Sequence, residues 1–147
     1  MEHVNTVKLT LISALGIAGG FISTLLGGWD TALQTLVIFM TVDYITGLIV
    51  AGVFKKSKKT ESGGLDSKAG WKGLGKKGVI LLVVLVATRL DILTGSGFFR
   101  DAAVIAYCAN ELLSIVENVG LMGVYIPEPI KKGIDALNTL KQSKEGK

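Results

Sequence analysis

The chain has 147 residues, enough for one folded domain, but only 19% of them are charged while 49% are hydrophobic, and the mean hydropathy is +0.51. This balance, with nineteen glycines, argues against a water-soluble globular domain and favours membrane helices, in which glycine is frequent. The net charge is +4, the lysines are clustered, and the single cysteine, Cys108, excludes a disulfide within the chain.

The first apolar stretch, 9–28, contains twenty residues without a charge, which is the length of helix that crosses a bilayer. The segment before it has one lysine and one glutamate, and the stretch is longer than the apolar part of a typical signal peptide, so cleavage is disfavoured. Small residues form two stripes at helical spacing and predict close helix packing. These residues are Gly16 and Gly20 in one stripe and Gly19, Ser23 and Gly27 in the other.

The second apolar stretch, 32–54, is interrupted only by Asp43. An ionised aspartate at the centre of an inserted helix costs about 3 kcal/mol, so Asp43 is expected to pair with protein or to line water. Gly47 and Ala51 follow it at intervals of four residues and would let another helix approach closely. The acid is therefore predicted to lie on a helix-packing face.

A basic segment, 55–77, follows and is predicted to be a cytoplasmic loop, because it holds eight lysines against Glu61 and Asp66. Attraction to anionic membrane lipid explains these lysines without nucleic acid. The sequence GWKGLGKK within it lacks the Ser or Thr that a Walker A loop places after its lysine, so nucleotide binding is disfavoured. The lysines are Lys55, Lys56, Lys58, Lys59, Lys68, Lys72, Lys76 and Lys77. Trp71 and Leu74 suit a short helix along the inner surface, capped at Ser67.

Two further spans are predicted at 78–94 and 102–124. The apolar part of 78–94 is short and crosses only if it extends past Arg89 and Asp91, which could neutralise charges on the next helix. The stretch 102–124 is the weakest candidate by hydropathy because one flank is polar. With Asp43, that flank supplies the candidate pore-lining or assembly residues Asn110, Glu111, Ser114, Glu117 and Asn118. Such a helix either joins others around water or lies at the membrane surface.

The tail, 127–147, begins with Pro127 and Pro129, which end the preceding helix, and continues as a short amphipathic helix. The sequence thus predicts an all-α integral membrane protein with four transmembrane helices, or three and an interfacial helix. With four spans and a cytoplasmic basic loop, both termini are cytoplasmic. His3 is the only histidine, and Glu111 and Glu117 lie about 240° apart on a helix, so no catalytic, cofactor or metal site is predicted.

Three motifs in this order resemble the bacteriophage lysis and toxin-secretion holins, over the region from the second helix to about Leu140. The first is DYITG at 43–47, and the third is NELLSIVENVGLMGVYIPEPIKK from Asn110 onward. The second motif is a spaced set of residues formed by Ser67, Gly70, Gly73, Lys76 and Lys77. The resemblance implies a non-enzymatic homo-oligomer of the bacterial cytoplasmic membrane that opens lesions and releases an endolysin or a large toxin.

Two other functions fit the same residues. A small multi-pass channel or transporter would use Asp43 and Glu111 to handle protons or cations. A membrane scaffold would use the amphipathic tail to recruit a cytosolic partner. The sequence leaves open the cargo, the oligomer size, the lesion diameter and any control of timing.

Overall fold

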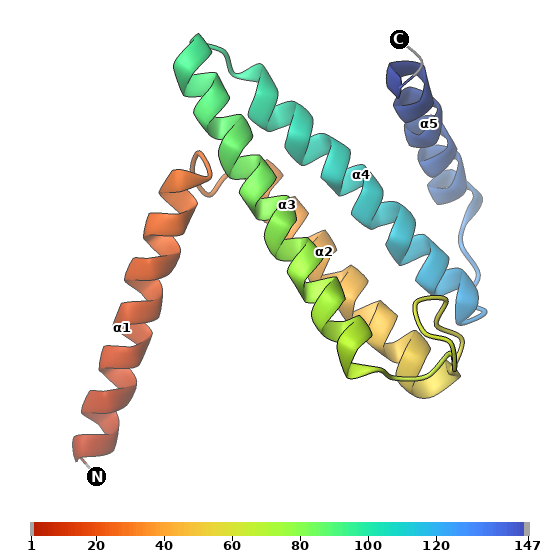
Figure 1. Ribbon diagram of the computed structural model, residues 1–147, viewed down its shortest axis with the longest axis horizontal. Coiled ribbons are helices and arrows are strands. Elements are labelled where there is room, and N and C mark those ends of the chain that lie inside the picture. Colours follow the sequence, from red (N-terminus) through yellow and green to blue (C-terminus); the bar gives the residue numbers. More distant parts are fainter. Residues whose placement is uncertain (1, 146–147) are drawn as a thin grey trace.

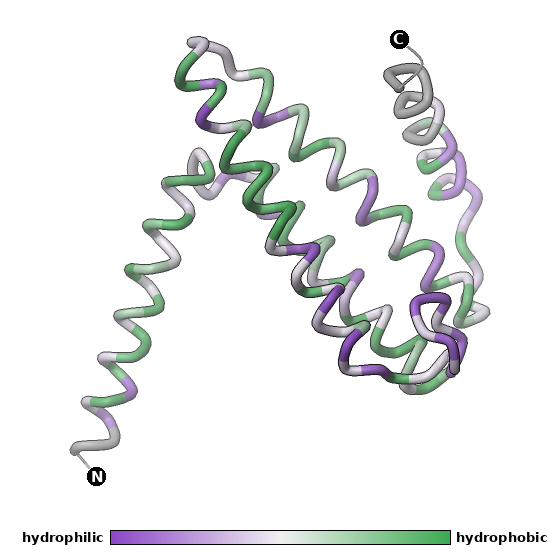
Figure 2. Tube along the Cα trace, viewed as in Figure 1, coloured by the Kyte–Doolittle hydropathy of each residue, from purple (hydrophilic) through white to green (hydrophobic). Residues whose placement is uncertain are grey.

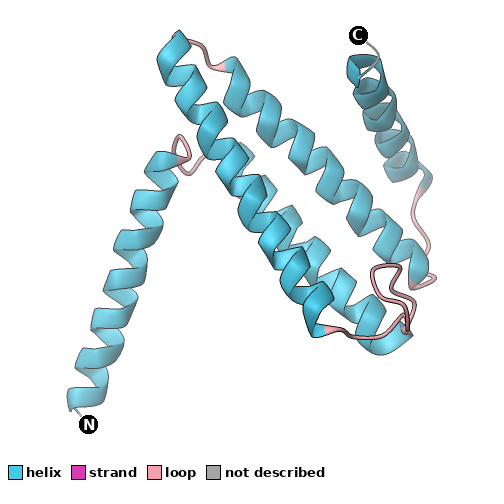
Figure 3. Ribbon diagram, viewed as in Figure 1, coloured by secondary structure: helices cyan, strands magenta, loops and turns pink. Residues whose placement is uncertain are grey.

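The computed structural model describes residues 2–145, and every regular element among them is helical (Figure 3). In chain order they are α1 (Glu2–Leu25), α2 (Thr31–Ile49), the π-helical turn η1 (Val50–Phe54), α3 (Ser67–Thr94), α4 (Phe98–Leu121) and α5 (Glu128–Glu145). The all-α prediction is confirmed. Three segments of the described chain are long and apolar enough to cross a membrane: Asn5–Leu25, Thr31–Phe54 and Phe98–Leu121.

Helices α2, α3 and α4 form a bundle in which the chain reverses direction at each turn, so that α2 and α4 run the same way (Figure 1). Its apolar core includes Leu33, Leu36, Met40, Val84 and Val104. The hydropathy colouring shows apolar residues along the helices of the bundle, whereas hydrophilic residues gather in the loop after η1 and on α5 (Figure 2). The bundle therefore exposes many large apolar side chains, and its hydrophilic residues gather toward the end that holds the loop after η1.

Helix α1 precedes the bundle and is joined to it at its C-terminal end. Along its length it packs on none of the bundle helices (Figure 1). None of its apolar span is buried inside the chain. A Cβ atom added at Gly16, Gly19 or Gly20 would meet nothing within 4 Å. Within the described residues, the stripe positions Gly16, Gly19 and Gly20 therefore have no partner helix, whereas Gly27, beyond the end of α1, lies against Arg100 of α4.

Helix α3 is longer than the span that the sequence predicts at 78–94, because its first turns include residues 67–77 of the expected basic loop. Asp66, rather than the expected Ser67, caps the helix, and its carboxylate accepts a hydrogen bond from the Ala69 N–H at 3.1 Å. Lysine is a good helix former, so charge ends an apolar run without ending a helix. The basic loop is thus shortened to residues 55–66.

The ranking of the candidate spans also changes. The segment Phe98–Leu121, expected to be the weakest by hydropathy, is among the three membrane-length apolar helices. Helix α3 is not among them, since Lys77, Arg89 and Asp91 add charges to its apolar part. What α3 does with these charges therefore decides whether it can lie at membrane depth.

The C-terminal helix α5 begins at Glu128 and packs against the end of α4. Its Ile134 is buried and Ile130 is half exposed. Lys131 forms an ion pair with Glu128 at 3.1 Å and lies 5.7 Å from the centre of the Tyr125 ring. The described part of this helix thus buries Ile134, while Glu128 and Lys131 stay exposed.

Candidate functional site

Three charged side chains, one from each helix of the bundle, meet in its interior. The Lys77 ammonium on α3 donates a hydrogen bond to Asp43 Oδ2 on α2 at 2.8 Å, and it also forms an ion pair with Glu111 on α4. The side chains of Lys77, Asp43 and Glu111 are only 11%, 8% and 5% exposed. We call these three residues the ion cluster.

Asn118 on α4 extends the ion cluster toward α2. Its Nδ2 donates to Asp43 Oδ1 at 3.2 Å and to Thr46 Oγ1 at 3.0 Å. Gly47 lies beside it, since a Cβ added there would be in ordinary contact with the Asn118 amide nitrogen at 3.8 Å. Every buried side-chain nitrogen and oxygen in the described chain has a hydrogen-bond partner. The polar interior is therefore satisfied within one chain.

The ion cluster contains two carboxylates and one ammonium, so its formal charge is −1 when all three are ionised. Burying such groups costs several kcal/mol per ion, and only close pairing offsets that cost. Lys77 also borders an open, mostly apolar groove of about 500 Å³ between α2 and α3, which Met40, Tyr44 and Leu81 help to line. The cluster can hold three helices together, and it can supply charges to water if the helices move apart.

The predicted polar flank of α4 does not lie on one face. Glu111 and Asn118 are buried, whereas Asn110 and Glu117 are exposed and Ser114 is intermediate. A spacing of four residues rotates about 40° per step on an α-helix, so Asn110 and Asn118 point in different directions. Glu111 and Asn118, seven residues apart, share the buried face. Ala51, in η1, is buried, as is Asp43 on α2.

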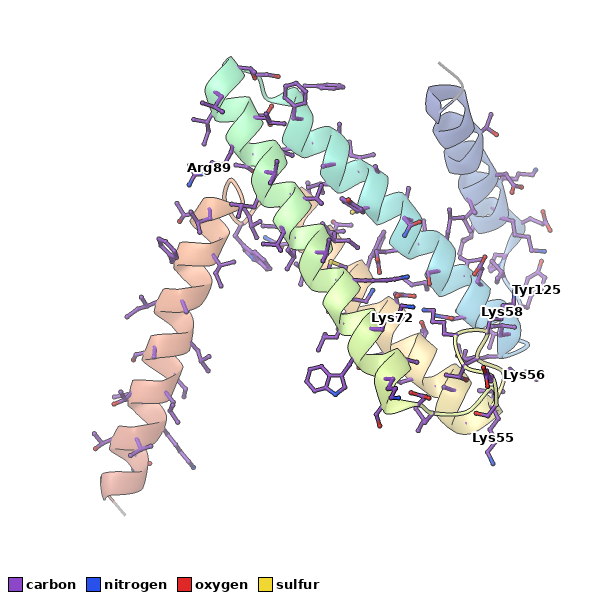
Figure 4. The ribbon with its side chains drawn as sticks, viewed as in Figure 1. Lys55, Lys56, Lys58, Lys72, Arg89 and Tyr125 are labelled. Carbon is purple, nitrogen blue, oxygen red and sulfur yellow. The ribbon has the colours of Figure 1, made fainter. Side chains whose placement is uncertain are left out.

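The sequence did not identify Lys77 as a member of this site, because it counted this residue with the basic loop. Lys77 directly precedes the apolar run that starts at Gly78, and the need of Asp43 and Glu111 for a cation at the edge of an apolar stretch was the available signal. The prediction that Arg89 and Asp91 offset the charges of the next helix was wrong. Arg89 is exposed and lies on the side of α3 nearest the end of α1 (Figure 4), and Asp91 accepts hydrogen bonds from the Phe99 and Arg100 N–H groups at 2.9 and 2.8 Å.

A second buried charge lies at the opposite end of the bundle. The Arg100 guanidinium donates to the Leu26 carbonyl at 2.6 Å, to the Gly28 carbonyl at 3.3 Å and to Asp30 Oδ2 at 2.7 Å. The hydrogen bond from Arg100 lowers the pKa of Asp30 below its ordinary value of 3.8. This set of contacts, which we call the Arg100 clasp, joins the α1–α2 turn to the start of α4.

The comparisons with known proteins agree with the motifs. The model of the bacteriophage holin family matches residues 20–139. A Clostridium perfringens protein, described as an uncharacterized 14.9 kDa protein in the nagH 3' region, is 38% identical over 96% of this chain and 100% of its own. An uncharacterized protein of Listeria monocytogenes is 40% identical over 77% of this chain and 76% of its own. A probable holin of Bacillus phage phi105 is 35% identical over 78% of each chain. No solved structure matches the chain at a significant level.

Proposed function

Because this chain belongs to the bacteriophage holin family, we propose that it self-assembles in the bacterial cytoplasmic membrane and opens lesions in it. The family and the three membrane-length apolar helices make it a membrane protein with a holin-like role. The cargo under this proposal is an endolysin or a large secreted toxin. The function requires no reaction chemistry, only a change in how the helices pack.

The observation that carries the proposal is the isolation of α1. Between lipid-exposed helices there is no hydrophobic driving force, so association depends on close packing at small residues. Helix α1 carries Gly16 and Gly20 in one stripe and Gly19 and Ser23 in the other, and none of its apolar span is buried by the described chain. It can therefore pack against α1 or the bundle of another copy without disrupting the three-helix core.

The polar residues of α4 give a reason for assembly to lead to a lesion. Asn110 and Glu117 are exposed on a membrane-length helix, and a polar group facing lipid is costly. Neighbouring copies or water would lower that cost. At high density, separation of the helices would also bring Asp43, Glu111, Ser114 and Asn118 to the same aqueous boundary. The ion cluster then serves as the closed arrangement, and the lesion as its alternative.

The test is inducible expression in bacteria, with membrane potential and release of a co-expressed muralytic enzyme recorded together. Wild type should collapse the potential and release the enzyme after a delay. Gly16→Leu/Gly20→Leu should lengthen that delay several-fold at equal expression, since bulky residues block close packing. The matched control, Ile17→Leu, changes an exposed apolar position of the same helix and should keep wild-type timing. Wild-type expression that leaves the potential and the enzyme in place would refute the proposal.

One observation also favours a second function, a small channel for protons or cations. The ion cluster places two carboxylates and one lysine among three helices beside an open groove. A channel of this kind would give selective flux without cell death and without release of a protein-sized cargo. The same expression experiment therefore separates the two functions.

A further inference from the structure

The end of the molecule formed by residues 55–76 carries a dense positive charge. Seven lysines there are exposed, and none of them forms an ion pair with another described residue. They are Lys55, Lys56, Lys58, Lys59, Lys68, Lys72 and Lys76. Figure 4 shows Lys55, Lys56, Lys58 and Lys72 together at one end of the bundle, far from Arg89. We call this surface the basic end; Lys77, paired in the ion cluster, is not part of it.

The basic end has a defined shape. In the loop, the Ser57 N–H donates to the Gly63 carbonyl at 2.9 Å and Thr60 Oγ1 donates to the Gly64 carbonyl at 3.0 Å. Gly63 has a φ of +70°, and a Cβ there would collide with the Lys55 carbonyl. On α3, Lys68, Lys72 and Lys76 are spaced by four residues along one flank of the helix. The lysines are thus held on a compact loop and a helix rather than on an extended chain.

Apolar side chains lie among these lysines. Trp71 is 74% exposed, Leu65 is 66% exposed and Leu74 is 47% exposed. A nucleic acid would neutralise the lysines and could stack on Trp71, but it would leave Leu65 and Leu74 in water, as would a peptide with only acidic side chains. A membrane surface accepts both, because phosphates lie above the depth at which tryptophan settles. The composition of the surface therefore points to one class of partner.

We propose that the basic end binds the headgroups of anionic phospholipids, with Trp71 and Leu65 at the boundary between headgroups and acyl chains. The inference rests on the membrane insertion in the proposed function. Charge complementarity supports it, since the cytoplasmic leaflet is anionic and each lysine near such a surface strengthens association roughly fivefold. The lipid would fix the orientation of the chain and concentrate it where lipid of this class gathers.

Trp71 provides the measurement. The chain has two tryptophans, so Trp29→Phe leaves Trp71, at the basic end, as the single tryptophan, and excitation at its long-wavelength edge avoids the tyrosines. The full-length protein is reconstituted in vesicles of phosphatidylglycerol and phosphatidylcholine, in which one lipid or the other carries brominated acyl chains that quench tryptophan. Brominated phosphatidylglycerol should quench Trp71 about twofold more than brominated phosphatidylcholine at equal mole fraction, and about 1 M salt should remove the difference.

Two controls localise the effect. In Trp71→Phe the reporter is Trp29, in the turn at the opposite end of the bundle, where the two lipids should quench equally. Replacing Lys55, Lys56, Lys58 and Lys59 by Gln should abolish the preference at Trp71, while Lys131→Gln/Lys132→Gln should preserve it. All these lysines are exposed, so the fold, checked by circular dichroism, should be retained.

Equal quenching of Trp71 by both lipids, no quenching by either, or the same preference at Trp29 would each overturn the inference. Release of an entrapped dye from the same vesicles separates this result from the proposed function. Leakage without lipid preference refutes the lipid site and leaves the proposed function in place. A preference without leakage refutes the proposed permeabilisation and leaves the lipid site.

Discussion

At the scale of single residues, the position of one lysine relative to its neighbours changes its role. Lys76 and Lys77 are adjacent in the sequence, yet Lys76 is exposed and Lys77 is paired with two carboxylates inside the bundle. Helical geometry turns consecutive side chains by about 100°, so only one of the two can face α2 and α4. The ion pairs of Lys77 with Asp43 and Glu111 are costly to break, because removing one partner leaves a buried charge without compensation.

Lys77→Met should therefore lower the free energy of unfolding by about 3 kcal/mol, because Asp43 and Glu111 would then lie together without a cation. Adding Glu111→Gln should recover part of that loss by removing one of the two charges. Thermal unfolding in detergent micelles, followed by circular dichroism, measures both effects. Lys76→Met is the matched control and should leave the midpoint within error; a loss equal to that of Lys77→Met would show that the ion cluster is not the cause.

The contact between Asp30 and Arg100 predicts a dependence of stability on pH. Arg100 lowers the pKa of Asp30, so the stabilisation is complete above the ordinary value of 3.8 and is lost as pH falls through the lower pKa of the folded state. The effect should be below about 1 kcal/mol, since the Asp30 side chain is 48% exposed. Asp30→Asn keeps the helix cap and removes the charge.

The measurement is the difference between the unfolding midpoints of wild type and Asp30→Asn from neutral to acidic pH. The difference should be constant near neutrality and should shrink below pH 3.8. Asp101→Asn is the control, because Asp101 lies 3.5 Å from the guanidinium and is 63% exposed. A difference for Asp30→Asn that stays the same at every pH would contradict the assignment.

At the scale of the element, α1 is joined to the bundle only at the end near the Arg100 clasp. Gly27 and Gly28 both have positive φ values, of +88° and +101°. A Cβ at Gly27 would lie 2.6 Å from Arg100 Nε, whereas one at Gly28 would meet nothing within 4 Å. Alanine substitutions at the two glycines therefore distinguish the cost of backbone strain from the cost of displacing the arginine.

Gly28→Ala should cost about 1 kcal/mol from backbone strain, and Gly27→Ala should cost more because it also displaces Arg100. In an Arg100→Ala background the two alanine substitutions should have equal effects. Thermal unfolding midpoints of the wild type, the three single variants and the two double variants test this. Equal costs in the native background would mean that Arg100 does not hold the turn.

The elements themselves follow largely from the sequence, because a run of about 20 apolar residues specifies a helix at membrane depth. The contacts between elements do not follow from it. Hydropathy places the start of the third helix after its lysines, at Gly78. In the structure the helix begins earlier, after its cap Asp66, and Lys77 lies inside the bundle. Lys77 and Asp43 are 34 residues apart, and Arg100 and Leu26 are 74 apart. Pairings at such separations depend on how helices rotate and cross, which no local pattern encodes.

At the scale of the whole molecule, the ion cluster bears on the number of membrane spans. A free lysine on α3 would oppose insertion, whereas a lysine bonded to Asp43 and Glu111 presents little charge to lipid. The cluster thus favours four spans, with α3 crossing alongside α2 and α4. The alternative has α3 at the surface, and it would place α4 and everything after it in the opposite orientation.

Single cysteines introduced into a Cys108→Ser background distinguish these topologies. We expect Gly97→Cys, in the exposed α3–α4 turn, to react with a membrane-impermeant maleimide added to intact spheroplasts. Glu61→Cys in the loop after η1 and Lys132→Cys on α5 should react only after the membrane is opened, because four spans place both on the cytoplasmic side. With α3 at the surface, the reactivities of Gly97→Cys and Lys132→Cys would be exchanged, and Glu61→Cys would stay protected. The first pattern would establish that α3 crosses the membrane alongside α2 and α4, the helices to which Lys77 joins it.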